Sequence, residues 1–288
     1  MHKGLFVGQC SVELVYYLPC ALQAGQRMKA ERQLAFAGGT ATNAAIAFTA
    51  FENVATLVTG LGEHPLSEVA RSDIMERAVE LIDLDSLPHR PPSVGSVLVD
   101  LSTHDYGVAY STTYARKLRS VDLGEALFHE VEIMMVDGSY LPQAVEAAST
   151  AQRLGIPVVL DGGSWKEGLE ELLPLVDYLI ASKQFRIPGS SSNEDLFAAM
   201  REFGIYNVAI TRSEAPILAH ENGKTEEIPV PQVKVLDSLG AGDIFHGVFC
   251  HYILEQDFFT ALRFSGETAS KSCTSLGPRT WIEHIKLL

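Results

Sequence analysis

The 288-residue sequence has few cysteines and none of the spacings in which cysteine usually acts. No Cys-x-x-Cys pair is present, and no cysteine lies in a His/Cys cluster of the kind that holds zinc. We therefore expect reduced, partly buried thiols in a cytoplasmic protein. The four thiols are Cys10, Cys20, Cys250 and Cys273.

Excess positive charge and long apolar runs are also lacking. The formal net charge is −14, and general affinity for nucleic acid or an anionic membrane depends on basic patches, so we expect neither partner. No apolar run approaches the roughly 20 residues that cross a bilayer. The run after Met1-His-Lys3 breaks at Gly8, too early for a secretory signal. The apolar fraction of 47% is that of an ordinary globular protein.

Several catalytic motifs are absent from the sequence. It contains no Gly-x-x-x-x-Gly-Lys-Ser/Thr phosphate loop, no His-Glu-x-x-His zinc motif and no Gly-x-Ser-x-Gly nucleophile elbow. The turn Gly60-Leu-Gly-Glu-His-Pro65 lacks the third glycine of a dinucleotide fingerprint, so NAD binding is not expected. His64 in this turn is interpreted as a loop residue rather than a catalyst.

From residue 120 onward, short apolar segments alternate with helical ones. Such alternation predicts right-handed βαβ units and a doubly wound, mostly parallel α/β sheet with helices on both faces. Ligands of these sheets bind beyond the carboxyl ends of the strands, where Ser139, Asp161, Ser182 and Thr211 fall. We expect strands at 5–8, 54–59, 133–136, 157–160, 178–181 and 208–210, and helices at 121–128, 143–154, 166–173, 194–203 and 258–275.

The stretch Asp237-Ser-Leu-Gly-Ala-Gly-Asp243 joins a small-residue turn to a helix. The apolar residues after Asp243 recur at helical spacing, which places Gly240, Ala241 and Gly242 at a helix N-terminus. Free N–H groups and the helix dipole attract phosphate there, and glycine lets the phosphate approach the backbone. Asp243 would then accept the proton of a hydroxyl that attacks the bound phosphorus. The alternative is a plain turn followed by an N-cap aspartate.

A second motif, Ala37-Gly-Gly-Thr-Ala-Thr-Asn43, precedes the small-residue run 44–50, which is compatible with a helix. The two motifs together, Gly-Gly-x-x-x-Asn and Asp-x-x-Gly-Ala-Gly-Asp, resemble the paired signatures of the ribokinase-like (PfkB) carbohydrate kinases. The resemblance extends over nearly the whole chain. The context Gly-Ala-Gly-Asp-Ile-Phe-His-Gly, with Cys273 downstream, looks most like the ketohexokinases and kinases of fructose derivatives.

The resemblance implies one kinase domain over 1–288 that transfers the γ-phosphoryl group of MgATP to a hydroxyl of a monosaccharide. It implies a small β lid over the sugar, formed by segments of about 12–37 and 91–111, which in relatives often also provides a dimer interface. We therefore expect a homodimer through the lid. From the residues alone, these two segments look like short strands outside the main sheet.

Residue roles also follow from the resemblance. Asp243 would be the general base, and Gly240, Ala241 and Gly242 the anion hole. The sugar would be bound by Glu13, Gly39, Thr40, Asn43 and Asp243, and the nucleotide by Thr211, Arg212, Ser213, Glu214, Ala215 and Cys273. Asp237, with the loop after the last helix, would hold a monovalent cation such as K⁺. From the residues alone, Glu13 could be a solvated strand charge, Arg212 an exposed loop arginine and Asp237 a turn residue.

The sequence departs from the family at five places, the first being Glu13, where relatives usually have the shorter aspartate. Ser182-Lys-Gln-Phe185 replaces an Asn-x-x-Glu motif that helps to arrange magnesium, so magnesium would depend on water and nucleotide oxygens. Arg212-Ser-Glu-Ala-Pro216 replaces a glycine-rich turn, Gly62-Glu-His64 replaces Gly-Asp-Asp, and no arginine stands in His104-Asp-Tyr106. Two alternatives follow: a nucleoside kinase of the same family, and a sugar-binding protein of kinase fold that has lost efficient turnover.

Overall fold

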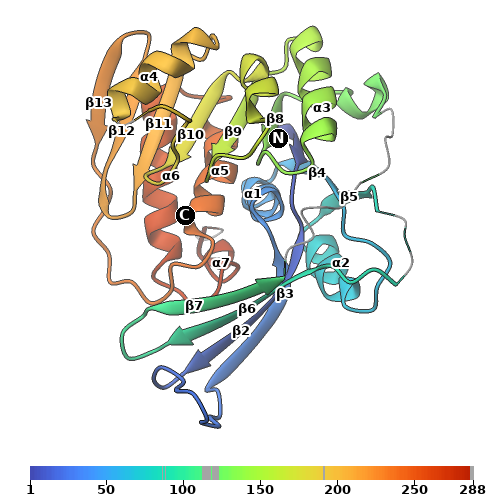
Figure 1. Cartoon of the computed structure of the whole chain (residues 1–288), viewed down its shortest axis with the longest axis vertical. Helices are drawn as coiled ribbons and strands as arrows, with labels where there is room; N and C mark the ends of the chain where they lie inside the picture. The colour runs from blue at the N-terminus through green and yellow to red at the C-terminus, as the bar shows by residue number, and fades with distance from the viewer. Residues whose placement is uncertain (86, 88, 112–117, 119–122, 191, 286–288) are drawn as a thin grey trace.

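The computed structural model describes residues 1–85, 87, 89–111, 118, 123–190 and 192–285. Its larger sheet has nine strands in the order β13-β12-β11-β10-β9-β8-β1-β4-β5 (Figure 1). All neighbouring pairs from β11 to β5 are parallel, whereas the pairs β11-β12 and β12-β13 are antiparallel. The strands are β1 (Lys3–Val7), β4 (Val54–Thr59), β5 (Val79–Asp83), β8 (Ile133–Val136), β9 (Val158–Gly162), β10 (Tyr178–Ser182), β11 (Asn207–Arg212), β12 (Ala215–Glu221) and β13 (Lys224–Ile228).

Helices cover both faces of this sheet, because successive strand residues point into two different cores. Phe6 and Met135 belong to one core with helices α1, α5 and α6, whereas Leu5 and Met134 belong to the other with α3 and α4. This arrangement confirms the predicted fold class. The helices are α1 (Thr40–Thr49), α2 (Ser67–Glu76), α3 (Leu141–Leu154), α4 (Asn193–Glu202), α5 (Ala241–Tyr252), α6 (Phe258–Ser272) and α7 (Trp281–Ile285).

Two predicted helices are wrong. Segment 166–173 contains only 3₁₀ turns, Leu169–Glu171 and Leu173–Leu175, because Gly168 is left-handed (φ 84°) and Pro174 interrupts an α-helix. In segment 121–128, residues 121 and 122 lie outside the described residues, and the remainder is a 3₁₀ turn over Glu125–Phe128. The last long helix ends at Ser272, three residues before the expected end.

A separate four-stranded sheet forms the lid, in the order β3-β2-β6-β7. Its strands are β2 (Ser11–Leu18), β3 (Arg32–Gly38), β6 (Ser93–Asp100) and β7 (Tyr106–Ser111). The sheet projects from one end of the main body (Figure 1). Only Gly8-Gln9-Cys10 separates β1 from β2, and only Gly39 separates β3 from α1.

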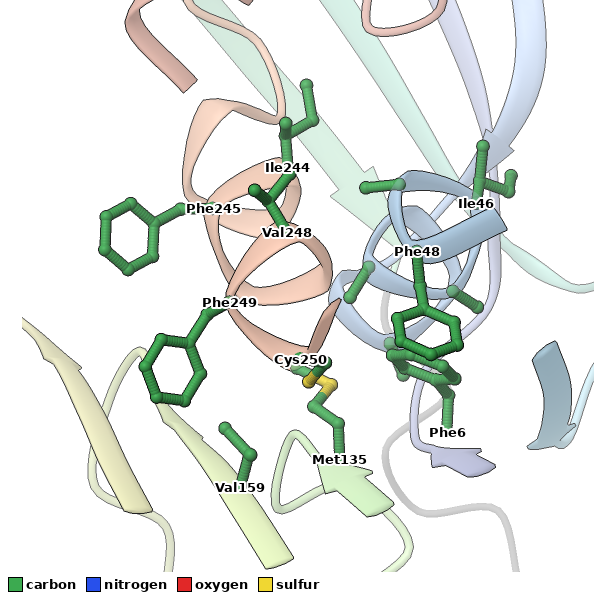
Figure 2. Packing of buried hydrophobic residues seen from close by; sticks show 14 of the residues in the cluster. Phe6, Ile46, Phe48, Met135, Val159, Ile244, Phe245, Val248, Phe249 and Cys250 are labelled. Carbon is green, nitrogen blue, oxygen red and sulfur yellow. The ribbon is translucent and has the colours of Figure 1, made fainter. Parts of the chain in front are cut away.

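Helices α1 and α5 lie side by side above the sheet, with Phe6, Met135 and Val159 beneath them (Figure 2). Gly247 permits this approach. A Cβ there would overlap the carbonyl oxygen of Ala44 and would lie 2.7 Å from the Cβ of Ala47. The small side chains of α1 therefore set the spacing between the two helices that carry the two motifs.

Among the described residues, no helix has the length and apolar character that a membrane span requires.

Candidate active site

The Gly-Ala-Gly-Asp motif begins α5, as expected. Gly240 is the N-cap and adopts a left-handed conformation (φ 74°), which glycine allows without strain. The N–H of Ala241 donates to the carbonyl of Ser238 at 3.2 Å. Within the described residues the N–H groups of Gly242 and Asp243 donate to no acceptor. Two backbone donors at the positive end of a helix are therefore available to an anion.

The Gly-Gly-x-x-x-Asn motif begins α1. Gly39 has φ 95°, and a Cβ there would overlap the carbonyl oxygen of Gln9 and lie 3.1 Å from the Cα of Cys10. The Thr42 hydroxyl donates to the same Gln9 oxygen at 3.0 Å. The glycine thus lets α1 start directly against the junction of β1 and β2, with Asn43 in its first turn.

The two motifs meet through their polar side chains. The Asn43 amide Nδ2 donates to Oδ2 of Asp243 at 2.7 Å. Asn43 is buried, and Asp243 is half-buried in the first turn of α5. Residues from opposite ends of the sequence therefore form one polar centre at the carboxyl edge of the parallel strands.

Burial, together with the nearby charge of Asp161, raises the pKa of Asp243 from 3.8 to about 6. Hydrogen bonds from Asn43 and Thr40 and the proximity of His246 oppose this rise. Burial also raises the pKa of Asp161, whose Oδ2 lies 3.5 Å from Nδ1 of His246. A carboxyl with a pKa near 6 is suited to accept a proton near neutral pH.

Arg279 also belongs to this centre, although no sequence motif marks it. Its Nη1 donates to Oδ1 of Asn43 at 2.9 Å, and its Nη2 donates to the carbonyl of Ala37 at 2.6 Å and to Asp73 at 3.1 Å. The guanidinium also lies over the ring of Phe36. Because Nη1 supplies hydrogen to Oδ1, the amide nitrogen of Asn43 is directed at Asp243. In the sequence, Arg279 is a single arginine after Gly277-Pro278, and nothing in that pattern indicates a contact with Asn43.

Glu13 lies on the lid, over two glycines of the neighbouring strands. A Cβ at either Gly38 or Gly95 would overlap the Glu13 side chain, so both glycines make room for it. Its Oε1 accepts a hydrogen bond from the Ser11 hydroxyl at 2.7 Å, and burial raises its pKa. Glu13 is therefore held in a slot of the sheet rather than extended into solvent.

A pocket of about 530 Å³ adjoins the start of α5. Four of the residues predicted to bind nucleotide line it: Thr211, Ser213, Glu214 and Cys273. Ala241 and Gly242 line it as well, so the pocket and the polar centre share the first turn of α5. The lid contributes Tyr106.

Arg212 and Ala215, in contrast, do not line this pocket. The Arg212 side chain donates to the carbonyl of Pro216 at 2.6 Å and to Glu227 at 2.7 Å, so it braces the β12-β13 hairpin. Ala215 is the first residue of β12. The sequence did not predict this hairpin. Its antiparallel pairing places Glu227 within reach of Arg212, so the arginine side chain binds the hairpin instead of lining the pocket.

Asp237 lies just before the motif turn and is buried. Its Oδ2 accepts hydrogen bonds from the Tyr17 hydroxyl at 2.5 Å and from the Gly277 N–H at 2.8 Å. Its Oδ1 accepts one from the Leu239 N–H at 2.9 Å. The carboxylate therefore joins the lid, the motif turn and the loop after α6.

Known proteins resemble this chain over almost its entire length. Residues 1–285 match the model of the pfkB family carbohydrate kinase. Ribokinase of Haemophilus influenzae is 21% identical over 299 residues, covering 98% of this chain and 96% of that protein. Ribokinase of Arabidopsis thaliana, solved with ribose and ATP, has a TM-score of 0.76 at 17% identity and covers 99% of this chain and 98% of that one. A ribokinase-like structure from Escherichia coli, solved with ATP and Mg²⁺, has a TM-score of 0.78 at 17% identity and covers 100% and 98%. The match over almost the entire length confirms the resemblance seen in the motifs: the chain belongs to the pfkB family of carbohydrate kinases.

Proposed function

We propose that the protein transfers the γ-phosphoryl group of ATP to a hydroxyl of a monosaccharide, with residues 1–288 acting as one unit and segments 12–37 and 91–111 as its lid. One observation carries this proposal. Asp243, whose pKa is raised to about 6, accepts a hydrogen bond from Asn43, and the two residues before it line a pocket of about 530 Å³. A base, two free N–H donors and a nucleotide-sized cavity thus adjoin each other.

In this proposal Asp243 takes the proton of the attacking sugar hydroxyl. The hydroxyl oxygen forms a bond to the γ-phosphorus as the bond to the β-phosphate oxygen breaks, and ADP leaves. The N–H groups of Gly242 and Asp243, at the helix turn begun by Gly240 and Ala241, stabilise the charge on the transferred group. The ATP-bound relative supports the nucleotide as donor.

Mg²⁺ would enter with the nucleotide and neutralise charge on its phosphates. Such an ion keeps several waters and needs few protein ligands. Segment 182–185 fits this mode of binding, because it offers no carboxylate and the Ser182 hydroxyl donates to the carbonyl of Gly163 at 2.9 Å. The Escherichia coli relative with ATP and Mg²⁺ supports the ion.

For the acceptor we propose a neutral polyol held by Asn43, Gly39, Thr40 and Glu13. The polar groups at this end are amide, hydroxyl and carboxyl groups, which suit sugar hydroxyls. Arg279 is engaged with Asn43, Ala37 and Asp73 and so does not present a free cation to an anionic acceptor. We also propose a homodimer that forms through the lid. The surface that favours it is β7, an edge strand of the lid whose residues are all exposed.

The test is ADP release from MgATP across a panel of hexoses, ketoses, pentoses and nucleosides. We expect turnover with one class of monosaccharide. Faster turnover with a nucleoside than with its free sugar would instead establish a nucleoside kinase. A sugar that raises the thermal midpoint without ADP release would establish a sugar-binding protein of kinase fold.

Replacing Arg279 by lysine is expected to lower kcat about tenfold or more, because one ammonium group cannot reach Asn43, Ala37 and Asp73 together. The freed Asn43 amide would no longer keep its nitrogen on Asp243. The measurement is kcat and KM, determined separately, with circular dichroism to check the fold.

The matched control for this variant is Arg153→Lys, because Arg153 pairs with Glu125 on the exposed surface at 2.9 Å. It should leave kcat unchanged. A folded Arg279→Lys protein with the wild-type kcat would contradict the orienting role.

A further inference from the structure

The buried carboxylate of Asp237 has hydrogen atoms directed at both of its oxygens. Oδ2 accepts from the Tyr17 hydroxyl at 2.5 Å and from the Gly277 N–H at 2.8 Å, and Oδ1 accepts from the Leu239 N–H at 2.9 Å. A monovalent cation at this position, as the family resemblance implies, requires oxygen lone pairs that are not already directed at donors. Three donors thus occupy most of the acceptor sites of Asp237, which leaves a poor fit for such an ion.

Neighbouring backbone carbonyls are engaged as well. The Cys273 carbonyl accepts from the N–H groups of Leu236, at 2.8 Å, and Asp237, at 3.2 Å. The Leu276 carbonyl accepts from the Thr280 hydroxyl at 2.8 Å, and the Pro278 carbonyl from the indole of Trp281 at 2.9 Å. K⁺ is held by several carbonyl oxygens that replace its water shell. Here these oxygens already hold the loop after α6 together.

Tyr17 is fixed in position by packing. It is fully buried in the lid cluster of Val15, Phe36, Val97 and Val99, against which Leu239 and Leu276 of the main body pack. Burial and the charge of Asp237 raise the pKa of Tyr17, so its hydroxyl keeps its proton and remains a donor.

We propose that the Tyr17 hydroxyl, together with the N–H groups of Leu239 and Gly277, satisfies Asp237 in place of a monovalent cation, and that this kinase works without one. Tyr17 is then a positioning residue, because it acts on the anion-hole turn through Asp237. A second hydrogen bond joins the lid to the main body next to Asp237: Nδ1 of His104, in the lid, lies 3.1 Å from the carbonyl oxygen of Leu236. The inference rests on the proposed kinase function.

The first experiment compares the wild-type protein in potassium, sodium and tetramethylammonium chlorides at equal ionic strength. We expect kcat to agree within about twofold, and the thermal midpoint to show no rise specific to potassium, since a ligand that binds only the folded state raises that midpoint. Activation of about tenfold or more by potassium, or a potassium-specific rise in the midpoint, would overturn the proposal. The midpoint comparison needs no sugar, so it remains decisive even if the kinase proposal fails in the substrate panel.

The second experiment uses Tyr17→Phe, which keeps the buried ring and removes only the donor. We expect kcat in tetramethylammonium to fall about tenfold or more, the usual effect of losing a hydrogen bond to a charged group. Potassium, which can now approach Asp237, should restore part of the loss. A variant as fast as the wild type in tetramethylammonium would count against the positioning role.

Tyr16→Phe is the matched control. Tyr16 is the adjacent residue on the opposite face of β2, where its hydroxyl accepts a hydrogen bond from Gln33 at 3.2 Å. Its loss should change neither kcat nor the response to salt. A similar fall in both variants would indicate general weakening of the lid and would contradict the inference.

Discussion

Replacing Asp243 by asparagine is expected to lower kcat by a factor of about 10² to 10⁴, the usual contribution of a positioned general base. Asparagine keeps the size of the side chain and an oxygen that can accept from the Asn43 amide. It cannot take a proton from the sugar hydroxyl. The measurement is ADP release with the sugar found in the panel, and sugar binding should persist, as judged by a sugar-dependent rise in the thermal midpoint.

The raised pKa of Asp243 gives this variant two further signatures. Only the ionised carboxylate is a base, so wild-type kcat/KM should be constant well above pH 6 and fall as the pH drops through about 6. The residual activity of the asparagine variant should lack this step. A wild-type profile that stays flat through this range would remove Asp243 from the role of base.

Stability should change in the opposite sense. Because the folded-state pKa is raised from 3.8 to about 6, the ionised carboxylate costs the folded protein free energy. This cost is fully present above pH 6 and disappears as the pH falls toward 3.8. Asp243→Asn should therefore melt at a higher temperature than the wild type at neutral pH, and the difference should shrink on acidification. The gain in stability with the loss of turnover separates a catalytic role from a structural cap, whose loss would lower the midpoint.

Gly247→Ala is expected to destabilise the protein by about 1 to 3 kcal/mol and to lower turnover as well. The added methyl group would overlap the Ala44 carbonyl and lie 2.7 Å from the Ala47 Cβ, so α1 and α5 would have to separate. Asn43 is on one of these helices and Asp243 on the other, and their 2.7 Å hydrogen bond would lengthen. Urea unfolding measures the loss of stability, and kcat reports the effect of separating Asn43 from Asp243.

A second helical glycine provides the control. At Gly266 the new methyl group would lie 3.3 Å from the end of the Ile217 side chain, which can move, and 3.9 Å from the Phe245 ring. Because Gly266 lines the pocket of about 530 Å³, this variant is compared for stability alone. Alanine is the better helix former, so Gly266→Ala should be neutral or stabilising by up to about 1 kcal/mol. Equal losses of stability in the two variants would show that the helix spacing is not the cause.

The two motif turns could be located from sequence because their signals are local. Small residues before a 3.6-residue apolar period predicted where α5 begins, and continuous apolar strands predicted a parallel sheet. For α1 the sequence indicated only a helix-compatible run over 44–50, and the helix begins earlier, at Thr40. The predicted helix over 166–173 is wrong because the left-handed Gly168 lies inside this window and Pro174 follows it directly, and both outweigh a helical pattern.

Arg279, Tyr17 and the orientation of Arg212 could not be predicted in this way. Each depends on partners far along the chain: Asn43 for Arg279, Asp237 for Tyr17 and Glu227 for Arg212. A tyrosine in a strand or an arginine in a loop looks the same in sequence whether it is solvated or holds a buried partner. Sequence therefore predicted where the chemistry lies better than it predicted what holds the chemistry in place.

The short junctions at the base of the lid determine how that sheet can move. The junctions Gly8-Gln9-Cys10 and Gly39 are too short to let the sheet move freely. The Asp137 carboxylate accepts hydrogen bonds from the N–H groups of Gln9, at 2.7 Å, and Ala41, at 3.4 Å. Both junctions are thus fastened to one side chain. A rotation of the lid about these two junctions would therefore move its distant tip much further than its base.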